Sequence, residues 1–436
     1  MTPSPAAPWL FLFVSLVGAA FTATAVLRIR RISYLIVPYF FGAWLTGELA
    51  VHHVAWQAIA TVVFVALGAL DAWPGWLGLA ITVTSWAALA IFHQLAGVTG
   101  AVFDAALDHD LAEADGPTSA GVPFRRIARP FKFPVRGVER IRNVAYGPHG
   151  RRNQLDVYLP LAADGAGPFP ILFQIHGGGW TIGQKDQQAL PLLYHLAARG
   201  WLCVAANYRL SPRATFPDHL VDVKRALAWT KRHAAEYGGD PSFVVVTGGS
   251  AGGHLAALVA LTANDPEYQP GFEDADTTVQ GCVPFYGVYD FLDRYGERGR
   301  ASMTSFLGRL VMKSSPETDR DAWEKASPIA RVHADAPPFF VIHGTHDSLA
   351  YVEDARHFVR ALRGVSRHPV VYAELPGAQH AFDIFHSRRS AYAVDAVTRF
   401  VERLRVEELA RRASGAVPRD AAAPGRTPTR AAAGRA

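Results

Sequence analysis

The chain has 436 residues, of which 50% are hydrophobic and only 19% are charged, with a formal net charge of +5. This length exceeds one typical domain, and the apolar composition argues against a wholly soluble enzyme and for a membrane portion. Much of the positive charge lies in an arginine-rich C-terminal stretch, so we infer no nucleic-acid partner, and no zinc-type spacing of Cys or His occurs.

Residues 1–100 form a region distinct from everything after them. Four apolar segments follow one another there and are interrupted by short polar or charged groups. Because a bilayer core about 30 Å thick needs roughly 20 helical residues, we expect four membrane-spanning helices, the second and third of marginal length. A soluble hydrophobic bundle is the alternative. The segments are residues 8–27, 32–47, 54–70 and 76–98.

The arginines of this region predict which side of the membrane each loop occupies. Arg28, Arg30 and Arg31 separate the first two segments, and basic loops favour the cytoplasmic side of a cell membrane. Four spans would then place the rest of the chain outside the cytoplasm. A basic stretch between Arg125 and Arg136 opposes this orientation, but it lies farther from the last span.

The remaining chain divides into three parts. Residues 101–139 have mixed charge and several prolines and are expected to be a connector or a cap over the site. Residues 140–405 alternate apolar strand-like runs with helical stretches, which predicts a mostly parallel sheet flanked by helices. The first two runs have no helix between them and predict a hairpin. Residues 406–436 are rich in Ala, Pro, Gly and Arg and predict a disordered basic tail.

Two cysteines, Cys203 and Cys282, lie inside apolar runs of this α/β part. Their simplest interpretation is two buried thiols, although the sequence leaves a disulfide open. The cysteines therefore do not identify the redox compartment.

The stretch VVVTGGSAGGH (244–254) places a single serine among four glycines, between a strand-like and a helix-like run. The pattern G-x-S-x-G in this context predicts a nucleophile elbow, a sharp turn that lifts the hydroxyl of Ser250 out of the sheet edge. The start of the following helix would point toward any negative charge that develops there.

A serine hydroxyl needs a general base and a third group that orients the base. We expect His380, in LPGAQHAFD, to be the base and Asp347, in VIHGTHDSL, to orient it, because each follows a predicted strand and the order Ser-Asp-His is typical of α/β hydrolases. Neighbouring candidates, less favoured, are His343, His346, Asp354 and Asp383, and His254 is expected to be a packing or hydrogen-bonding residue.

The run HGGGW (176–180) follows another strand-like run. Glycines let backbone N–H groups approach an oxyanion closely, so Gly178 and Gly179, with the N–H of Ala251, are the expected oxyanion hole. The alternative is an ordinary glycine turn.

Together these motifs resemble the hormone-sensitive-lipase-like group of α/β hydrolases, which includes bacterial carboxylesterases and lipases, and the multi-span N-terminus resembles that of certain esterases in this group. The resemblance implies carboxylic-ester hydrolysis without cofactor or metal, through Ser250, Asp347 and His380. The family usually has Asp before the serine and Asn after the last glycine of the elbow. Here Gly249 and His254 stand instead, which brings the chain nearer a branch with formamidases and feruloyl-type esterases.

We therefore expect a serine esterase or lipase with a small-molecule or lipid ester as substrate and membrane lipid as surroundings, its oligomeric state open. An amidase, deacetylase or peptidase with the same triad is the alternative, and a non-catalytic membrane receptor on this fold or a transporter is a weaker one. Residues 287–335 are long for a strand connection and are expected to cover the site. Their apolar members would line an acyl pocket or simply pack in the core: Phe291, Phe306, Leu307 and Leu310.

Overall fold

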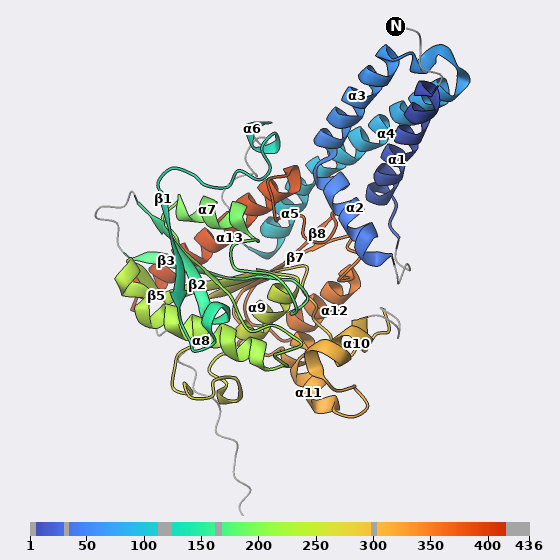
Figure 1. Cartoon of the computed structure of the whole chain (residues 1–436). Coiled ribbons are helices and arrows are strands. Elements are labelled where there is room, and N and C mark those ends of the chain that lie inside the picture. The colour runs from blue at the N-terminus through green and yellow to red at the C-terminus, as the bar shows by residue number, and fades with distance from the viewer. Residues whose placement is uncertain (1–5, 30–34, 112–123, 162–167, 298–302, 416–436) are drawn as a thin grey trace, which may run out of the picture.

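A computed structural model describes residues 6–29, 35–111, 124–161, 168–297 and 303–415. It consists of an α/β domain and a helical bundle that projects from one side of this domain (Figure 1). The N-terminal end of the chain lies at the far end of the bundle.

The α/β domain is built on one eight-stranded sheet with the order β1-β2-β4-β3-β5-β6-β7-β8. The predicted hairpin is present, since β1 and β2 pair antiparallel, and β2 also pairs antiparallel with β4. All other neighbours are parallel, and most of their residues are buried because helices cover both faces. The strands are β1 Val138–Ala145, β2 Gln154–Pro160, β3 Phe169–Ile175, β4 Leu202–Ala206, β5 Gly239–Gly249, β6 Gly281–Phe285, β7 Phe339–Gly344 and β8 Val370–Leu375.

Two hydrophobic cores lie on the two faces of this sheet. One packs α8, α9 and α12 against the strands, with Leu220, Leu255 and Phe358 fully buried, and the other packs α5, α7 and α13. Figure 1 shows these two helical layers. The helices are α5 Thr99–Asp110, α7 Leu190–Ala197, α8 Asp218–His233, α9 Ala251–Leu261, α12 Val352–Arg363 and α13 Arg388–Ala413.

The domain boundaries differ at two places from those the composition suggests. Helix α5 lies in the expected connector, yet Phe103 and Leu107 are fully buried in the second core, with Phe103 against Phe340. Helix α13 continues to Ala413, beyond residue 405, and residues 416–436 lie outside the described part of the chain. This last stretch of α13 has few apolar residues at helical spacing. An ion pair between Arg412 and Asp240 (2.7 Å) connects it to β5 instead.

The expectation of four spans stays a prediction, and the described helices fit a smaller number by length and composition. Among the described residues, α1 (Ala7–Val26) and the continuous α4–α5 segment are the helices long and apolar enough to cross a membrane, and α2 with α3 adds at most one more span. Helix α2 (Ile36–Glu48) has 13 residues and is about 20 Å long, too short for a core of about 30 Å. It is bent by 89° from α3 (Ala50–Ala66), and α4 covers Trp73–Gly97.

The segment after β6, expected to cover the site, contains only short helices. These are α10 Met303–Phe306, a π-helical turn Leu307–Met312 and α11 Arg320–Lys325; a short α6, Phe124–Ile127, precedes β1.

Candidate active site

Ser250 lies at the turn between β5 and α9, as the elbow motif predicts. Its backbone has φ 59° and ψ −123°, a conformation that side chains rarely adopt. A Cβ on Gly252 would lie 2.1 Å from the carbonyl oxygen of Ile175, so only glycine lets α9 pack this closely against β3. The strained backbone conformation therefore falls at Ser250, the residue whose hydroxyl is proposed to react.

Asp347 and His380 follow the carboxyl ends of the neighbouring strands β7 and β8. The distance between Asp347 Oδ2 and His380 Nδ1 is 2.6 Å, and both side chains are almost fully buried. The carboxylate thereby fixes the imidazole with Nδ1–H toward Asp347 and leaves Nε2 as the proton acceptor.

The environment of Asp347 keeps its carboxyl ionised. Burial alone raises the pKa of Asp347, but the charge of His380 and hydrogen bonds from His343 and His380 outweigh burial, so this pKa lies well below its usual range. Oδ1 accepts hydrogen bonds from the backbone N–H groups of Leu349 (2.9 Å) and Ala350 (2.8 Å). His343 Nε2 lies 3.3 Å from Asp347 Oδ2, so His343 helps to hold this carboxylate in place.

The glycine run lies at the carboxyl end of β3, beside the elbow. Gly178 has φ 115°, a region suited to glycine, and its carbonyl accepts from the N–H groups of Thr181 and Ile182. The hydrogen bonds recorded for the described residues give no acceptor to the N–H groups of Gly178, Gly179 and Ala251.

Tyr286 connects the serine side of the site to the histidine side. Its ring lies 4.5 Å from the His380 ring, and a Cβ on Gly249 would lie 2.7 Å from its hydroxyl oxygen. The hydroxyl donates a hydrogen bond to Asp383, and the bonds recorded for these described residues do not include a direct one between Ser250 and His380. The sequence analysis does not single out Tyr286, which directly follows the apolar strand β6; the absence of the usual Asp at 249 is the signal that another side chain can fill this space.

A bundle helix also contacts the site, which the sequence did not reveal. The ring of Phe40 on α2 meets the His380 ring edge-on at 6.0 Å, and Trp44, one turn later, packs 5.2 Å from Phe385. Phe40 is only 8% exposed. The wall beside the imidazole is thus supplied by the N-terminal helical bundle.

The other candidates have structural surroundings. His254 accepts from Trp180 Nε1 (3.3 Å) and donates to the Ala326 carbonyl (2.7 Å), so it ties the elbow helix to the glycine run. Asp354 accepts from the N–H of Tyr289, and the His346 ring faces Phe92 of α4. Of the apolar residues expected over the site, Phe291 and Leu307 are fully buried in the core, Leu310 packs at its edge, and Phe306 lies against Gly179. Both cysteines are free and buried.

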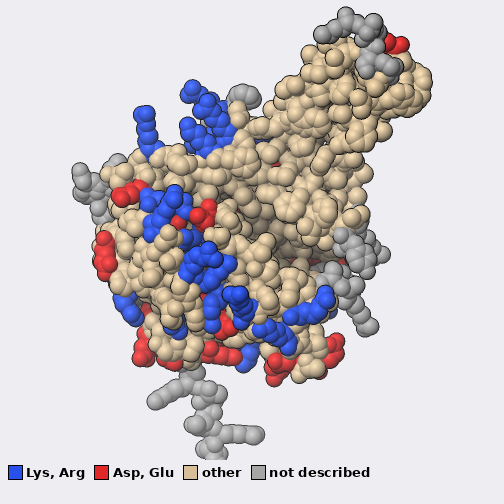
Figure 2. Space-filling model, in the orientation of Figure 1, with Lys and Arg blue, Asp and Glu red and all other residues tan. Residues whose placement is uncertain are grey.

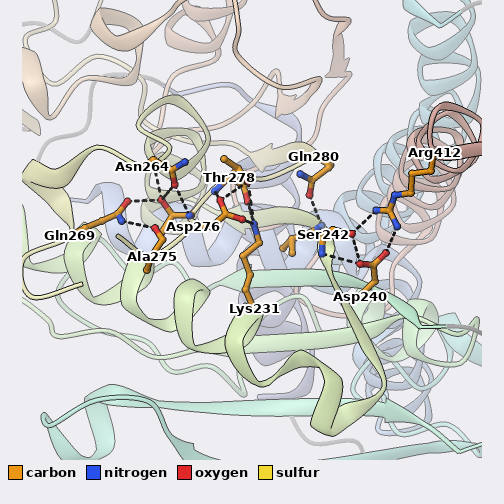
Figure 3. Close-up of polar contacts among 12 residues, drawn as sticks. Lys231, Asp240, Ser242, Asn264, Gln269, Ala275, Asp276, Thr278, Gln280 and Arg412 are labelled. Atoms are coloured by element: carbon orange, nitrogen blue, oxygen red, sulfur yellow. Dashed lines mark hydrogen bonds and ion pairs between the residues drawn. The ribbon is translucent and has the colours of Figure 1, made fainter. Parts of the chain in front are cut away.

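A cavity of about 560 Å³ lies at the opposite edge of the sheet, where β5 to β8 begin. Figure 3 shows that the charged groups around it already bind one another: Lys231 with Asp276 (2.5 Å), and Arg412 with Asp240. We assign no chemistry to this cavity, because its polar side chains serve to fasten α8 and α13 to the sheet.

The sheet order, the elbow and the acid–base pair at one sheet edge define an α/β hydrolase. The family model described as BD-FAE matches residues 155–362. The chain is 56% identical over 259 residues to the probable carboxylic ester hydrolase LipM of Mycobacterium tuberculosis, covering 59% of this chain and 60% of LipM. It is 49% identical over 260 residues to the esterase LipQ of the same organism, covering 59% of this chain and 61% of LipQ.

Solved structures share the fold. Esterase B from Lactobacillus rhamnosis has a TM-score of 0.56 at 20% identity, and the match covers 74% of this chain and 99% of that one. The chain spans about three fifths of the length of LipM and LipQ. Over the hydrolase domain the chain is therefore similar to proteins named as a probable carboxylic ester hydrolase and an esterase.

Proposed function

We propose that this protein is a serine carboxylic-ester hydrolase with Ser250 as nucleophile, His380 as general base and Asp347 as the orienting acid. The observation that carries the proposal is the buried 2.6 Å contact between Asp347 and His380 at the sheet edge that also bears the strained Ser250. The relatives named as esterases support the same reaction class.

In the proposed reaction, Ser250 Oγ attacks the ester carbonyl carbon while its proton passes to His380 Nε2. The carbonyl oxygen becomes an oxyanion that accepts hydrogen bonds from the N–H groups of Gly178, Gly179 and Ala251. The bond to the alkoxy oxygen then breaks, and the alcohol leaves with the proton from His380. Water, deprotonated by His380, next attacks the acyl-enzyme, which releases the carboxylic acid and restores Ser250.

Phe306 and Phe40 would border the acyl group on two sides, because Phe306 lies against Gly179 and Phe40 lies against His380. Both side chains are apolar, so the site favours an apolar acyl or alcohol group over a charged one.

The test is hydrolysis of a p-nitrophenyl ester series of increasing acyl length by the full chain. Ser250→Ala and His380→Ala should abolish turnover above background. Asp354→Asn, which changes a carboxylate outside the proposed triad, should retain hydrolytic activity. Normal hydrolysis by folded Ser250→Ala would refute the assignment. Matched amides, run beside the esters, distinguish an esterase from an amidase with the same triad.

A further inference from the structure

The two ends of the bundle differ in chemistry. At the end far from the hydrolase domain, the rings of Trp9 and Trp73 lie 5.4 Å apart, and Trp76 donates to the carbonyl of Leu70. Tryptophan is typical of a membrane–water interface. Between this end and the domain, apolar side chains such as Phe13, Ile59 and Ile91 are 63%, 66% and 70% exposed, as expected for a surface that faces lipid.

The near end of the bundle is fastened to the hydrolase domain. Arg389 of α13 donates to Glu48 at the end of α2 (2.8 Å), Ser387 donates to the same carboxylate (2.7 Å), and both members of the ion pair are fully buried. The Arg389 guanidinium also lies 4.9 Å from the centre of the Phe92 ring on α4. The hydrolase domain is therefore fastened directly to the near end of the bundle.

Helix α2 lies across this near end, roughly perpendicular to the spans, since it makes an angle of 89° with α3 (Figure 1). Its inner side carries Phe40 and Trp44 to the His380 loop. Its outer side presents Val37 and Phe41, which are 55% and 48% exposed, next to the equally exposed Leu35. A short helix in the membrane plane with one apolar face turned outward is the geometry of an interfacial helix.

Positive charge gathers beside α2. The connector after α6 packs against the same loop, because Phe131 lies 5.3 Å from Phe385 and the N–H of His386 donates to Pro130. Five basic side chains of this connector region are exposed: Arg125, Arg126, Arg129, Lys132 and Arg136. Figure 2 shows Lys and Arg side chains near α6 beside the base of the bundle, whereas the visible face of the bundle shows none.

The same end carries the basic residues that decide sidedness. The first 110 residues contain three Lys or Arg, all between α1 and α2: Arg28, Arg30 and Arg31. Arg28 reaches Glu353 of the hydrolase domain (3.4 Å), so Arg28 lies on the domain's side of the bundle. Counting α2 with α3 as one span beside α1 and α4 gives three crossings, and the rule that basic loops stay inside then gives the opposite orientation to the one expected from sequence.

We propose that the outer side of α2 and the basic connector (residues 124–136) rest on the anionic cytoplasmic leaflet of the cell membrane, and that esters dissolved in this leaflet reach Ser250 past Phe40. This inference rests on the proposed function, and it narrows the substrate to esters with a membrane-partitioning chain. Anionic headgroups complement the basic connector, and the apolar side of α2 continues the lipid-facing surface of the spans.

Sidedness is tested by cysteine labelling of the full chain in intact cells with a membrane-impermeant thiol reagent. Ala72→Cys, at the far end of the bundle, should be labelled, and Ala413→Cys, on the hydrolase domain, should be labelled only after permeabilisation. The native Cys203 and Cys282 are buried and provide a low background. Labelling of residue 413 but not of residue 72 in intact cells would overturn the proposal.

Substrate entry is tested in proteoliposomes of anionic or neutral lipid, with a long-chain ester dissolved in the bilayer and a short-chain ester in the aqueous phase. Val37→Asp should lower the ratio of long-chain to short-chain turnover about tenfold, since a carboxylate disfavours contact with the bilayer. Val365→Asp is the matched control, because Val365 is also exposed (45%) but lies before β8 at the far edge of the sheet. Val37→Ser should give a smaller fall in the same ratio.

A triple Arg125→Gln/Arg126→Gln/Arg129→Gln variant should lose any preference for anionic over neutral vesicles, while Arg213→Gln/Arg232→Gln should keep it. Equal ratios for Val37→Asp and Val365→Asp would refute entry along α2. Absence of turnover of both esters by the unmodified protein would instead refute the proposed function.

Discussion

The buried ion pair between Glu48 and Arg389 predicts that one uncharged substitution inside the bundle destabilises the whole chain. In Glu48→Gln, the guanidinium of Arg389 would keep its hydrogen bond to the Pro376 carbonyl (3.1 Å) and its contact with Phe92, but it would lose its only carboxylate among the recorded ion pairs of the described residues. Removing one partner of a fully buried pair costs about 3–5 kcal/mol, because the other charge stays desolvated.

This loss is measurable as a change in the thermal unfolding midpoint of the full chain in detergent. For a domain of this size about 1 kcal/mol corresponds to about 2–4 °C, so we expect a decrease of roughly 6–20 °C. Glu139→Gln, at an exposed position on β1, is the control and should change the midpoint little.

A double variant separates the loss of the pair from the loss of a side chain. In Glu48→Met/Arg389→Met neither charge remains to be desolvated, so most of the stability of Glu48→Gln should return. A midpoint for Glu48→Gln equal to that of Glu139→Gln would refute the reasoning, since it would mean that water or another group solvates Arg389 without Glu48.

Three further predictions concern the site and its supports. Asp347→Asn should lower kcat by roughly 10³–10⁴ with a smaller change in KM, measured on a short-chain ester, because the wrong imidazole tautomer would face Ser250. Gly249→Ala should destabilise the protein by about 1–3 kcal/mol in urea unfolding, since its Cβ would lie 2.7 Å from the hydroxyl of Tyr286, and Tyr286→Leu should remove most of that penalty. Burial lowers the pKa of His176 and His219 to about 4, so below about pH 6.5 the unfolded state binds more protons than the folded state. The unfolding free energy should therefore fall as the pH is lowered from about 6.5 to 4, by up to about 1.4 kcal/mol per pH unit for each histidine. Stability that stays constant over this range would contradict the assignment of neutral buried imidazoles.

The sequence was sufficient for the parts of the molecule whose signal is local. Strands β3 to β8 are largely apolar runs bounded by turn residues, and the elbow is recognisable because the pattern G-x-S-x-G lies at the end of β5. Asp347 and His380 are predicted from a similar local signal, since each lies in a short loop after an apolar strand.

Tyr286 could not be chosen in this way. It ends a run of apolar strand residues, and its place in the site depends on a φ of 35° and on Asp383, 97 residues later, which accepts its hydrogen bond. A contact between two residues so far apart in the chain leaves no local pattern in either segment, so only the three-dimensional arrangement reveals it.

The same limit explains the difference in the membrane region. In sequence, Glu48 looks like a residue of a polar loop between two spans, because a lone carboxylate inside an apolar helix is expensive. Its partner Arg389 lies 341 residues away, and with that partner Glu48 is buried where α2 meets α3. The carboxylate therefore lies at a bend, and with α2 and α3 counted as one span the described helices offer at most three crossings where the sequence predicts four. Because sidedness by charge depends on whether the number of crossings is even or odd, the proposed orientation of the hydrolase domain requires that number to be three.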